Sequence, residues 1–245
     1  MTQPSDFAHK NPRLLAIAVL VFTLSFVLSP LATIGFNGFS AGQFPIPQID
    51  PPVQPAGYAF SIWGVIYLWL ILGAVCGVLR AADDPDWRAM RAPLAISLII
   101  GTFWIAAANA APVLATLMIL VMAAAAIRAM LLAGTNQHWL QARPVALYAG
   151  WLTAASGVGV GVVLGGYAIL SAQLAALLCL LAVLSVALLV QSKRPREWAY
   201  PAAVIWALGG VILANWPGQN WPVIALAALG ITALTLRAVH PFMRG

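Results

Sequence analysis

Residues 171–190 read SAQLAALLCLLAVLSVALLV, a run of 20 residues without a charged side chain. A helix needs about 20 predominantly apolar residues to cross the hydrocarbon core of a bilayer, so this stretch predicts a transmembrane helix. The whole chain has the same character, because 62% of its 245 residues are hydrophobic and 7% are charged, against roughly 25% charged in soluble domains. Twelve basic and six acidic side chains cannot cover a water-facing surface of this size. The composition therefore predicts an all-α integral membrane protein without a sizeable soluble domain.

The other apolar stretches predict about seven more helices, so that the chain crosses the membrane about eight times. The shortest of them is 201–214. A polar stretch, 80–91, separates the second predicted helix from the third, and a tight corner at 109–112 joins the third to the fourth. Besides 171–190, the predicted helices are 14–34, 56–79, 93–108, 112–132, 144–165, 201–214 and 222–239.

The connection between the first two predicted helices, residues 35–55, is rich in glycine and proline. It contains Pro45, Pro47, Pro51 and Pro52, and each proline removes a backbone donor and fixes φ, which excludes a regular helix. Loops of about 20 residues are commonly functional or disordered. This proline-rich segment is therefore a candidate for a functional role.

Basic residues are confined to one side of the predicted topology. With the N-terminus in the cytoplasm, the four outside connections contain no lysine or arginine, as the positive-inside rule requires. This segregation predicts a bacterial inner-membrane protein with both termini in the cytoplasm. It also accounts for the net charge of +6 without a nucleic-acid partner, because the basic residues form no continuous face. The inside basic residues are Lys10, Arg13, Arg80, Arg88, Arg91, Arg128, Arg143, Lys193, Arg194, Arg196, Arg237 and Arg244.

Residues with catalytic or metal-binding chemistry are scarce in the sequence. It contains no GxSxG, HExxH or Walker motif. His9, His138 and His240 have no histidine, cysteine or carboxylate at ligand spacing, which argues against a metal site. Cys76 and Cys179 lie in apolar segments, where cysteine acts as a small hydrophobe. We therefore expect no enzyme activity, no metal and no resident cofactor.

The fifth predicted helix carries Gly157, Gly161 and Gly165, which are four residues apart. Small residues at this spacing let a neighbouring helix backbone approach closely in a membrane. The pattern favours tight packing within the chain; a dimer contact or a substrate passage is the alternative.

Aromatic residues mark the start of the second predicted helix. Phe60, Trp63 and Tyr67 are three and four residues apart, so they share one helical face directly beneath the proline-rich segment. Aromatic rings that face one another inside a bundle form a flat-walled pocket suited to a planar hydrophobic ligand. The segment above would then act as a lid. The alternative is that these rings face lipid or fill the core.

The same stretch resembles a known signature. A proline-rich loop ending in Pro55 and followed by Phe-x-x-Trp-x-x-x-Tyr, at Phe60, Trp63 and Tyr67, is similar to the tryptophan-rich sensory protein family, the family of TspO and the mitochondrial translocator protein. The resemblance extends over about residues 14–166.

Two further helices carry weaker matches to this family. Pro144, Tyr148 and Trp151 resemble its fifth helix, although Tyr148 stands where the family usually has tryptophan. Trp104 resembles a tryptophan of its third helix, but Gly101 replaces the asparagine that the family has three residues earlier. This replacement leaves the identity of the ligand open.

The resemblance implies a five-helix TspO-like bundle in residues 1–166, followed by three additional C-terminal helices in residues 167–245. It implies a tetrapyrrole- or sterol-like ligand in an aromatic pocket below the first outside loop, and a homodimer as one form of assembly. The ligand-binding residues that it nominates are Pro55, Phe60, Trp63, Tyr67, Trp104, Tyr148 and Trp151.

Three functions follow from these observations. A membrane-embedded binding or sensory protein, with the bilayer and a hydrophobic small molecule as its partners, accounts for the aromatic face, the loop and the resemblance. A transporter of a small hydrophobic or zwitterionic solute is the alternative, because the chain has about eight helices and no catalytic motif. An intramembrane enzyme is the weakest, because acid–base residues are missing from the predicted spans.

Overall fold

The computed structural model describes residues 12–33, 36, 38–135 and 138–243, and within them it contains eight α-helices and no β-strand. The predicted all-α fold is thereby confirmed. The helices are α2 (Pro12–Leu28), α3 (Ile62–Leu79), α4 (Pro85–Ala110), α5 (Pro112–Leu132), α6 (Arg143–Gly166), α7 (Ala172–Lys193), α8 (Ala199–Asn215) and α9 (Trp221–Met243). Some residues of the predicted topology lie outside the described ranges: His9, Lys10, Ile34, Gly35 and Arg244.

Seven segments of the described chain are long and apolar enough to cross a membrane. The remaining helix, α8, has 17 residues and rises about 25 Å, close to the hydrocarbon thickness of about 30 Å. The protein is therefore an integral membrane protein built from a helical bundle.

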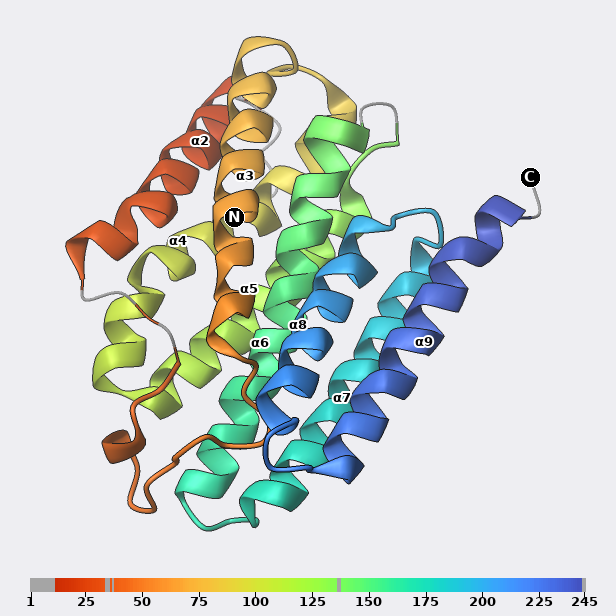
Figure 1. Cartoon of the computed structure of the whole chain (residues 1–245). Helices are drawn as coiled ribbons and strands as arrows, with labels where there is room; N and C mark the ends of the chain where they lie inside the picture. Colours follow the sequence, from red (N-terminus) through yellow and green to blue (C-terminus); the bar gives the residue numbers. More distant parts are fainter. Residues whose placement is uncertain (1–11, 34–35, 37, 136–137, 244–245) are drawn as a thin grey trace, which may run out of the picture.

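Helix α6 lies at the centre of this bundle. It packs against α3, α5, α7 and α8, while α2 packs on α3 and α4, and α9 packs on α7 and α8. In Figure 1 the proline-rich segment lies at the same end of the bundle as the α6–α7 and α8–α9 connections. The segment contains one short 3₁₀ turn, η2 (Ala41–Gln43), and leads into a second, η3 (Gly57–Ser61), from which α3 continues.

Glycines of α6 allow its neighbours to approach closely. A Cβ atom at Gly150 would collide with the carbonyl oxygen of Tyr200 in α8, and one at Gly161 would lie 3.0 Å from Cγ1 of Val53 in the proline-rich segment. Gly157 likewise faces the Val183 side chain of α7. These glycines therefore serve packing within the chain, which is the first of the two interpretations of their spacing.

The third predicted helix begins earlier than expected. We predicted its start at Pro93, but α4 starts at Pro85, so most of the polar stretch 80–91 is helical. Asp84 caps it, because its carboxylate accepts a hydrogen bond from the Asp86 backbone N–H at 2.9 Å. Proline is favourable in the first turn, where its missing N–H costs nothing. One charged side chain of this polar stretch is buried in a hydrogen-bonded site.

That charge belongs to Arg91, whose side chain is only 2% exposed. Its guanidinium donates to four backbone carbonyl oxygens at the end of α3, in the following turn and at the start of α2. They are those of Ala81, Ala82 (2.7 Å), Pro12 (3.1 Å) and Gly77 (3.4 Å). A buried cation is tolerated when its donors are satisfied, and here Arg91 also supplies carbonyls at a helix C-terminus with the donors that they lack. Arg91 therefore fastens three helices together.

A buried carboxyl group lies in the connection between α7 and α8. Glu197 is 5% exposed, and this burial raises the pKa of its carboxyl group, against the opposing effects of the Ala199 backbone N–H and the positive charges of Arg143 and Arg194. The folded protein therefore holds this proton more tightly than the unfolded chain does.

Replacing Arg91 with methionine should lower the melting temperature in detergent by about 6 °C or more, because it leaves several buried carbonyls without donors. Circular dichroism melting of the R91M variant measures the effect. Arg237→Met, at an exposed position of α9, is the matched control and should melt within about 1 °C of the wild type. Equal melting of both variants would contradict the role given to Arg91.

The stability that Glu197 contributes should fall as the pH rises. Between the ordinary carboxyl pKa of 4.5 and its raised value in the fold, the folded state binds more protons than the unfolded state, so deprotonation costs stability. The melting temperature of wild type, taken relative to that of Glu197→Gln, should therefore fall as the pH rises through this window. Asp83→Asn, whose carboxyl group is 67% exposed, serves as the control. If the melting temperature of wild type instead rises relative to that of Glu197→Gln as the pH increases, the assigned direction of the pKa shift is wrong.

Candidate functional site

Eight aromatic side chains from α2, the proline-rich segment, η3, α3, α4 and α6 are joined by ring contacts, and we call them the aromatic cluster. The ring contacts continue from Phe36 through Phe39 and Phe44 to Tyr167. Each ring centroid lies within 6.4 Å of at least one other ring in the group. The members are Phe26, Phe36, Phe60, Trp63, Tyr67, Trp104, Tyr148 and Trp151.

The predicted helical face of α3 lies at the centre of this cluster. Trp63 and Tyr67 stack with their centroids 5.1 Å apart and their planes at 28°. Phe26 of α2 meets both rings edge-on, at 5.6 and 5.3 Å, and Trp151 of α6 meets Trp63 edge-on at 6.0 Å. Stacked and edge-to-face contacts are the arrangements that aromatic rings favour. Three helices are thus joined through one indole ring.

A cavity adjoins the cluster on the side of the proline-rich segment. This first cavity is narrow, with a volume of about 40 Å³ open to a water-sized molecule, and it is partly open to the surroundings. Its walls come from the proline-rich segment, η3 and five helices. They are Phe36, Gly38, Phe39, Gln54, Pro55, Phe60, Trp63, Trp104, Ile119, Trp151, Ala154, Ala155, Val158, Gly159 and Ala207.

A second cavity adjoins the first and reaches toward α2. It has a volume of about 260 Å³ open to a water-sized molecule and is again partly open to the surroundings. It shares with the first cavity the side chains of Phe36, Phe60, Trp63, Trp104 and Ile119. Most of the other lining residues are apolar. The shared aromatic side chains therefore line both spaces.

Polar groups of the first cavity are few, and none of its lining residues is charged. Trp104 donates its Nε1–H to the carbonyl oxygen of Ala115 at 2.9 Å. Nε1 of Trp151 and Oε1 of Gln54 are buried without a hydrogen-bond partner among the described residues. The cavity residues therefore include one unused donor and one unused acceptor.

The structure brings five of the seven predicted ligand-binding residues to the wall of the first cavity. Pro55 and Phe60 come from the segment and η3, Trp63 from α3, Trp104 from α4 and Trp151 from α6. Their assignment to ligand binding stays a prediction, but these five residues, which the family resemblance nominated, share one location.

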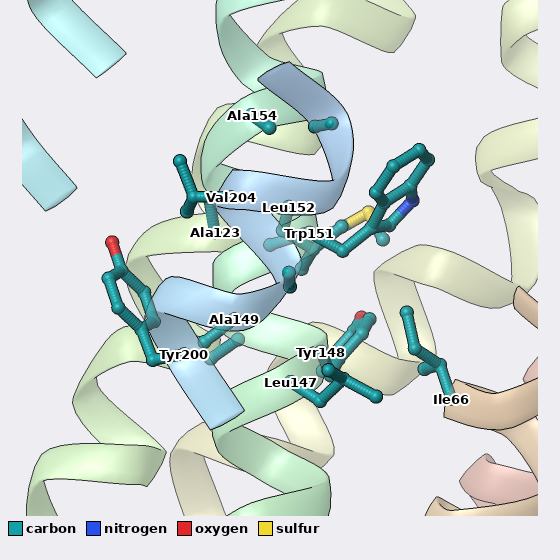
Figure 2. Close-up of a cluster of buried hydrophobic side chains, with 14 of the residues drawn as sticks. Ile66, Ala123, Leu147, Tyr148, Ala149, Trp151, Leu152, Ala154, Tyr200 and Val204 are labelled. Carbon is teal, nitrogen blue, oxygen red and sulfur yellow. The ribbon is translucent and has the colours of Figure 1, made fainter. Parts of the chain in front are cut away.

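The two predicted tyrosines lie elsewhere. Tyr67 lines the second cavity, not the first. Tyr148 lines neither; it is fully buried, with its hydroxyl 2.9 Å from Oγ of Ser97. Figure 2 shows Tyr148 and Trp151 on the same side of α6, toward Ile66. Tyr148 thus lies within the packed core behind the aromatic walls.

Several lining residues were not predicted from the sequence. Phe36, Phe39 and Gln54 lie in the proline-rich segment, and Phe26 in α2 lines the second cavity. Ala207 comes from α8, outside the residues of the family resemblance. The aromatic residues on both sides of the prolines were a usable signal, whereas an alanine in an apolar helix carries none.

The position of the missing asparagine has a structural explanation. A Cβ atom at Gly101 would lie 2.8 Å from two ring atoms of Phe26 and 3.1 Å from the terminal carbon of Met122. The Phe26 ring therefore occupies the space that a longer side chain at residue 101 would need. In this chain an aromatic ring replaces the polar group.

These features define a class of protein: an α-helical membrane bundle with an aromatic cluster at the entry to its second spanning helix. A family model described as TSPO-like protein matches residues 14–240, so the chain belongs to the TSPO-like family. The match continues through α7 and α8 and into α9, whereas the division of the chain at residue 166 stays a prediction. No curated protein and no solved structure matches the chain significantly.

Substituting alanine for Gly101 should destabilise the protein, because the new methyl group overlaps the Phe26 ring. Overpacking of this kind costs about 1–3 kcal/mol. Thermal melting of G101A against Gly64→Ala provides the measurement, since a Cβ at Gly64 in the same kind of helix meets nothing within 4 Å. Adding Phe26→Leu should recover part of the loss in G101A. If G101A and G64A melt at the same temperature, the claim that the Phe26 ring fills the space beside Gly101 is wrong.

Proposed function

We propose that this protein binds a planar hydrophobic ligand, tetrapyrrole- or sterol-like, in the first cavity and acts as a membrane-embedded binding or sensory protein. The observation that carries the proposal is the wall of the cavity. It combines Phe60, Trp63, Trp104 and Trp151 with small residues of α6 and no charged side chain. Flat aromatic walls suit a planar apolar molecule, and membership of the TSPO-like family supports a sensory or ligand-binding role.

The polar groups of the cavity suggest how such a ligand is oriented. An unpaired buried donor or acceptor costs about 1–3 kcal/mol. A ligand that reaches Trp151 Nε1–H and Gln54 Oε1, which are buried in the unliganded fold, would gain affinity by pairing with them. We infer that the ligand presents a hydrogen-bond acceptor toward α6 and a donor toward the proline-rich segment. Charged groups of a ligand such as protoporphyrin IX would lie outside the cavity.

The cavity belongs to the non-cytoplasmic half of the membrane in this proposal. It lies beside the proline-rich segment. Basic residues lie at the opposite end of the bundle: Arg80 directly follows α3, and Lys193 is the last residue of α7. The positive-inside rule then orients the basic end toward the cytoplasm of a bacterial inner membrane. The homodimer that the resemblance implies stays a prediction.

Transport of a small hydrophobic or zwitterionic solute is the second candidate, and the adjoining second cavity favours it. The two spaces share a wall of aromatic side chains that would have to rotate to let a solute pass. Uptake of labelled solute into proteoliposomes at a rate above that of empty liposomes would support transport. Binding without uptake would support the sensory role.

Quenching of tryptophan fluorescence by protoporphyrin IX tests the proposed binding site. We expect saturable quenching in wild type and an affinity roughly fivefold weaker in Trp63→Phe, because the indole contributes about 1 kcal/mol of stacking. Trp198→Phe removes one tryptophan next to Arg143 at the other end of the bundle and should leave the affinity unchanged. Competition by cholesterol would indicate that a sterol shares the site.

Linear quenching that is equal in wild type, W63F and W198F would reject the cavity as a binding site for planar ligands. The aromatic cluster would then serve only the packing of α2, α3 and α6.

A further inference from the structure

Helix α8 is hydrogen-bonded to the residues that border the first cavity. Three bonds join it to residues 52–59, which we call the anchored segment. They run from Trp206 Nε1 to Ala59 O (2.9 Å), from Asn215 Nδ2 to Pro52 O (2.9 Å) and from Ala56 N to Gly210 O (3.0 Å). These bonds cross more than 140 positions of sequence, and they connect one of the three C-terminal helices to the entry of α3.

Close packing accompanies the hydrogen bonds. A Cβ atom at Gly210 would lie 2.8 Å from Cβ of Pro55 and 2.9 Å from Cβ of Ala59, so only glycine lets the anchored segment lie this close to α8. The Tyr58 and Trp206 rings meet edge-on at 5.4 Å. Between these contacts Ala207 forms part of the cavity wall.

The anchored segment is directly connected along the chain to the aromatic residues of the cavity wall. It includes Pro55, which lines the first cavity, and it precedes Phe60 and Trp63, which line it as well. A shift of the segment away from α8 would move Pro55 and the start of α3 together. Hydrogen bonds are stronger in a low-dielectric environment than in water, so α8 is well suited to oppose such a shift.

We propose that α8 is a positioning element of the ligand cavity: it holds the anchored segment against the bundle and closes one wall with Ala207. This role rests on the proposed function, and it assigns a task to helices that follow the five-helix unit. Opening the contacts between α8 and the anchored segment then limits the release of ligand. Trp206 is the positioning residue with the clearest test, because phenylalanine removes its N–H and keeps an aromatic ring.

Hydrogen exchange without ligand tests the anchoring itself. Trp206→Phe should raise the amide exchange rate of peptides covering residues 52–59 by about fivefold, as expected for the loss of one hydrogen bond. Trp216→Phe is the matched control, since this side chain is 58% exposed and meets Trp221 in place of the anchored segment. Equal exchange of both variants with wild type would overturn the anchoring.

Release of protoporphyrin IX tests the effect on the cavity. W206F should release the bound porphyrin about fivefold faster than wild type and W216F. Faster exchange in W206F with unchanged release would overturn the positioning role. Absence of saturable binding in wild type would reject the proposed function and the role in ligand release, while the exchange result would still decide whether α8 holds the segment.

Discussion

The close approach of neighbouring elements to α6 is the constraint on which the rest of the structure depends. Gly150 and Gly161 leave no side chain where α8 and the proline-rich segment pass. In a membrane, helices gain little from the hydrophobic effect on associating, so contact between backbones and small side chains has to supply the attraction. With these neighbours seated on its small residues, α6 directs Tyr148 and Trp151 toward α2 and α3. The glycines on the other faces of α6 thus fix the orientation in which its two aromatic residues enter the aromatic cluster.

Tyrosines of this core illustrate a second constraint of the membrane interior. A polar group in an apolar environment needs a partner inside the protein. The hydroxyl of Tyr148 lies 2.9 Å from Oγ of Ser97, and that of Tyr200 lies 3.0 Å from Oγ1 of Thr153. At the first cavity Trp104 follows this rule with Ala115, whereas Trp151 does not. Trp104 and Trp151 therefore differ in whether their indole N–H is paired within the protein.

The sequence predicted the bundle well because hydropathy alone determines which segments cross a bilayer. It failed at the start of α4, since a charged residue such as Arg91 looks incompatible with a buried helix until its carbonyl partners are known. Of the candidate site, the face of Phe60, Trp63 and Tyr67 followed from helical spacing. The contribution of Phe36 depends on how an irregular loop folds back, and that of Ala207 on which helices are neighbours in space. The aromatic character of Phe36 is visible in the sequence but its place in the cavity wall is not, and Ala207 has no local signal at all.

The contacts of α8 bear on how the eight α-helices of the described residues relate to the five-helix unit that the resemblance implies for residues 1–166. Helix α6 could pack on α3 and α5 alone, but its Gly150 surface would then leave backbone in contact with lipid, where α8 now lies. The anchored segment would likewise lose the donors of Trp206 and Asn215, leaving carbonyls of Ala59 and Pro52 with fewer partners at the membrane edge. Unsatisfied backbone groups are costly in that environment. The surface formed by α6 and the anchored segment is therefore complementary to α8 in shape and in hydrogen bonding. A change that separates α8 from this surface acts directly on the residues that border the cavity.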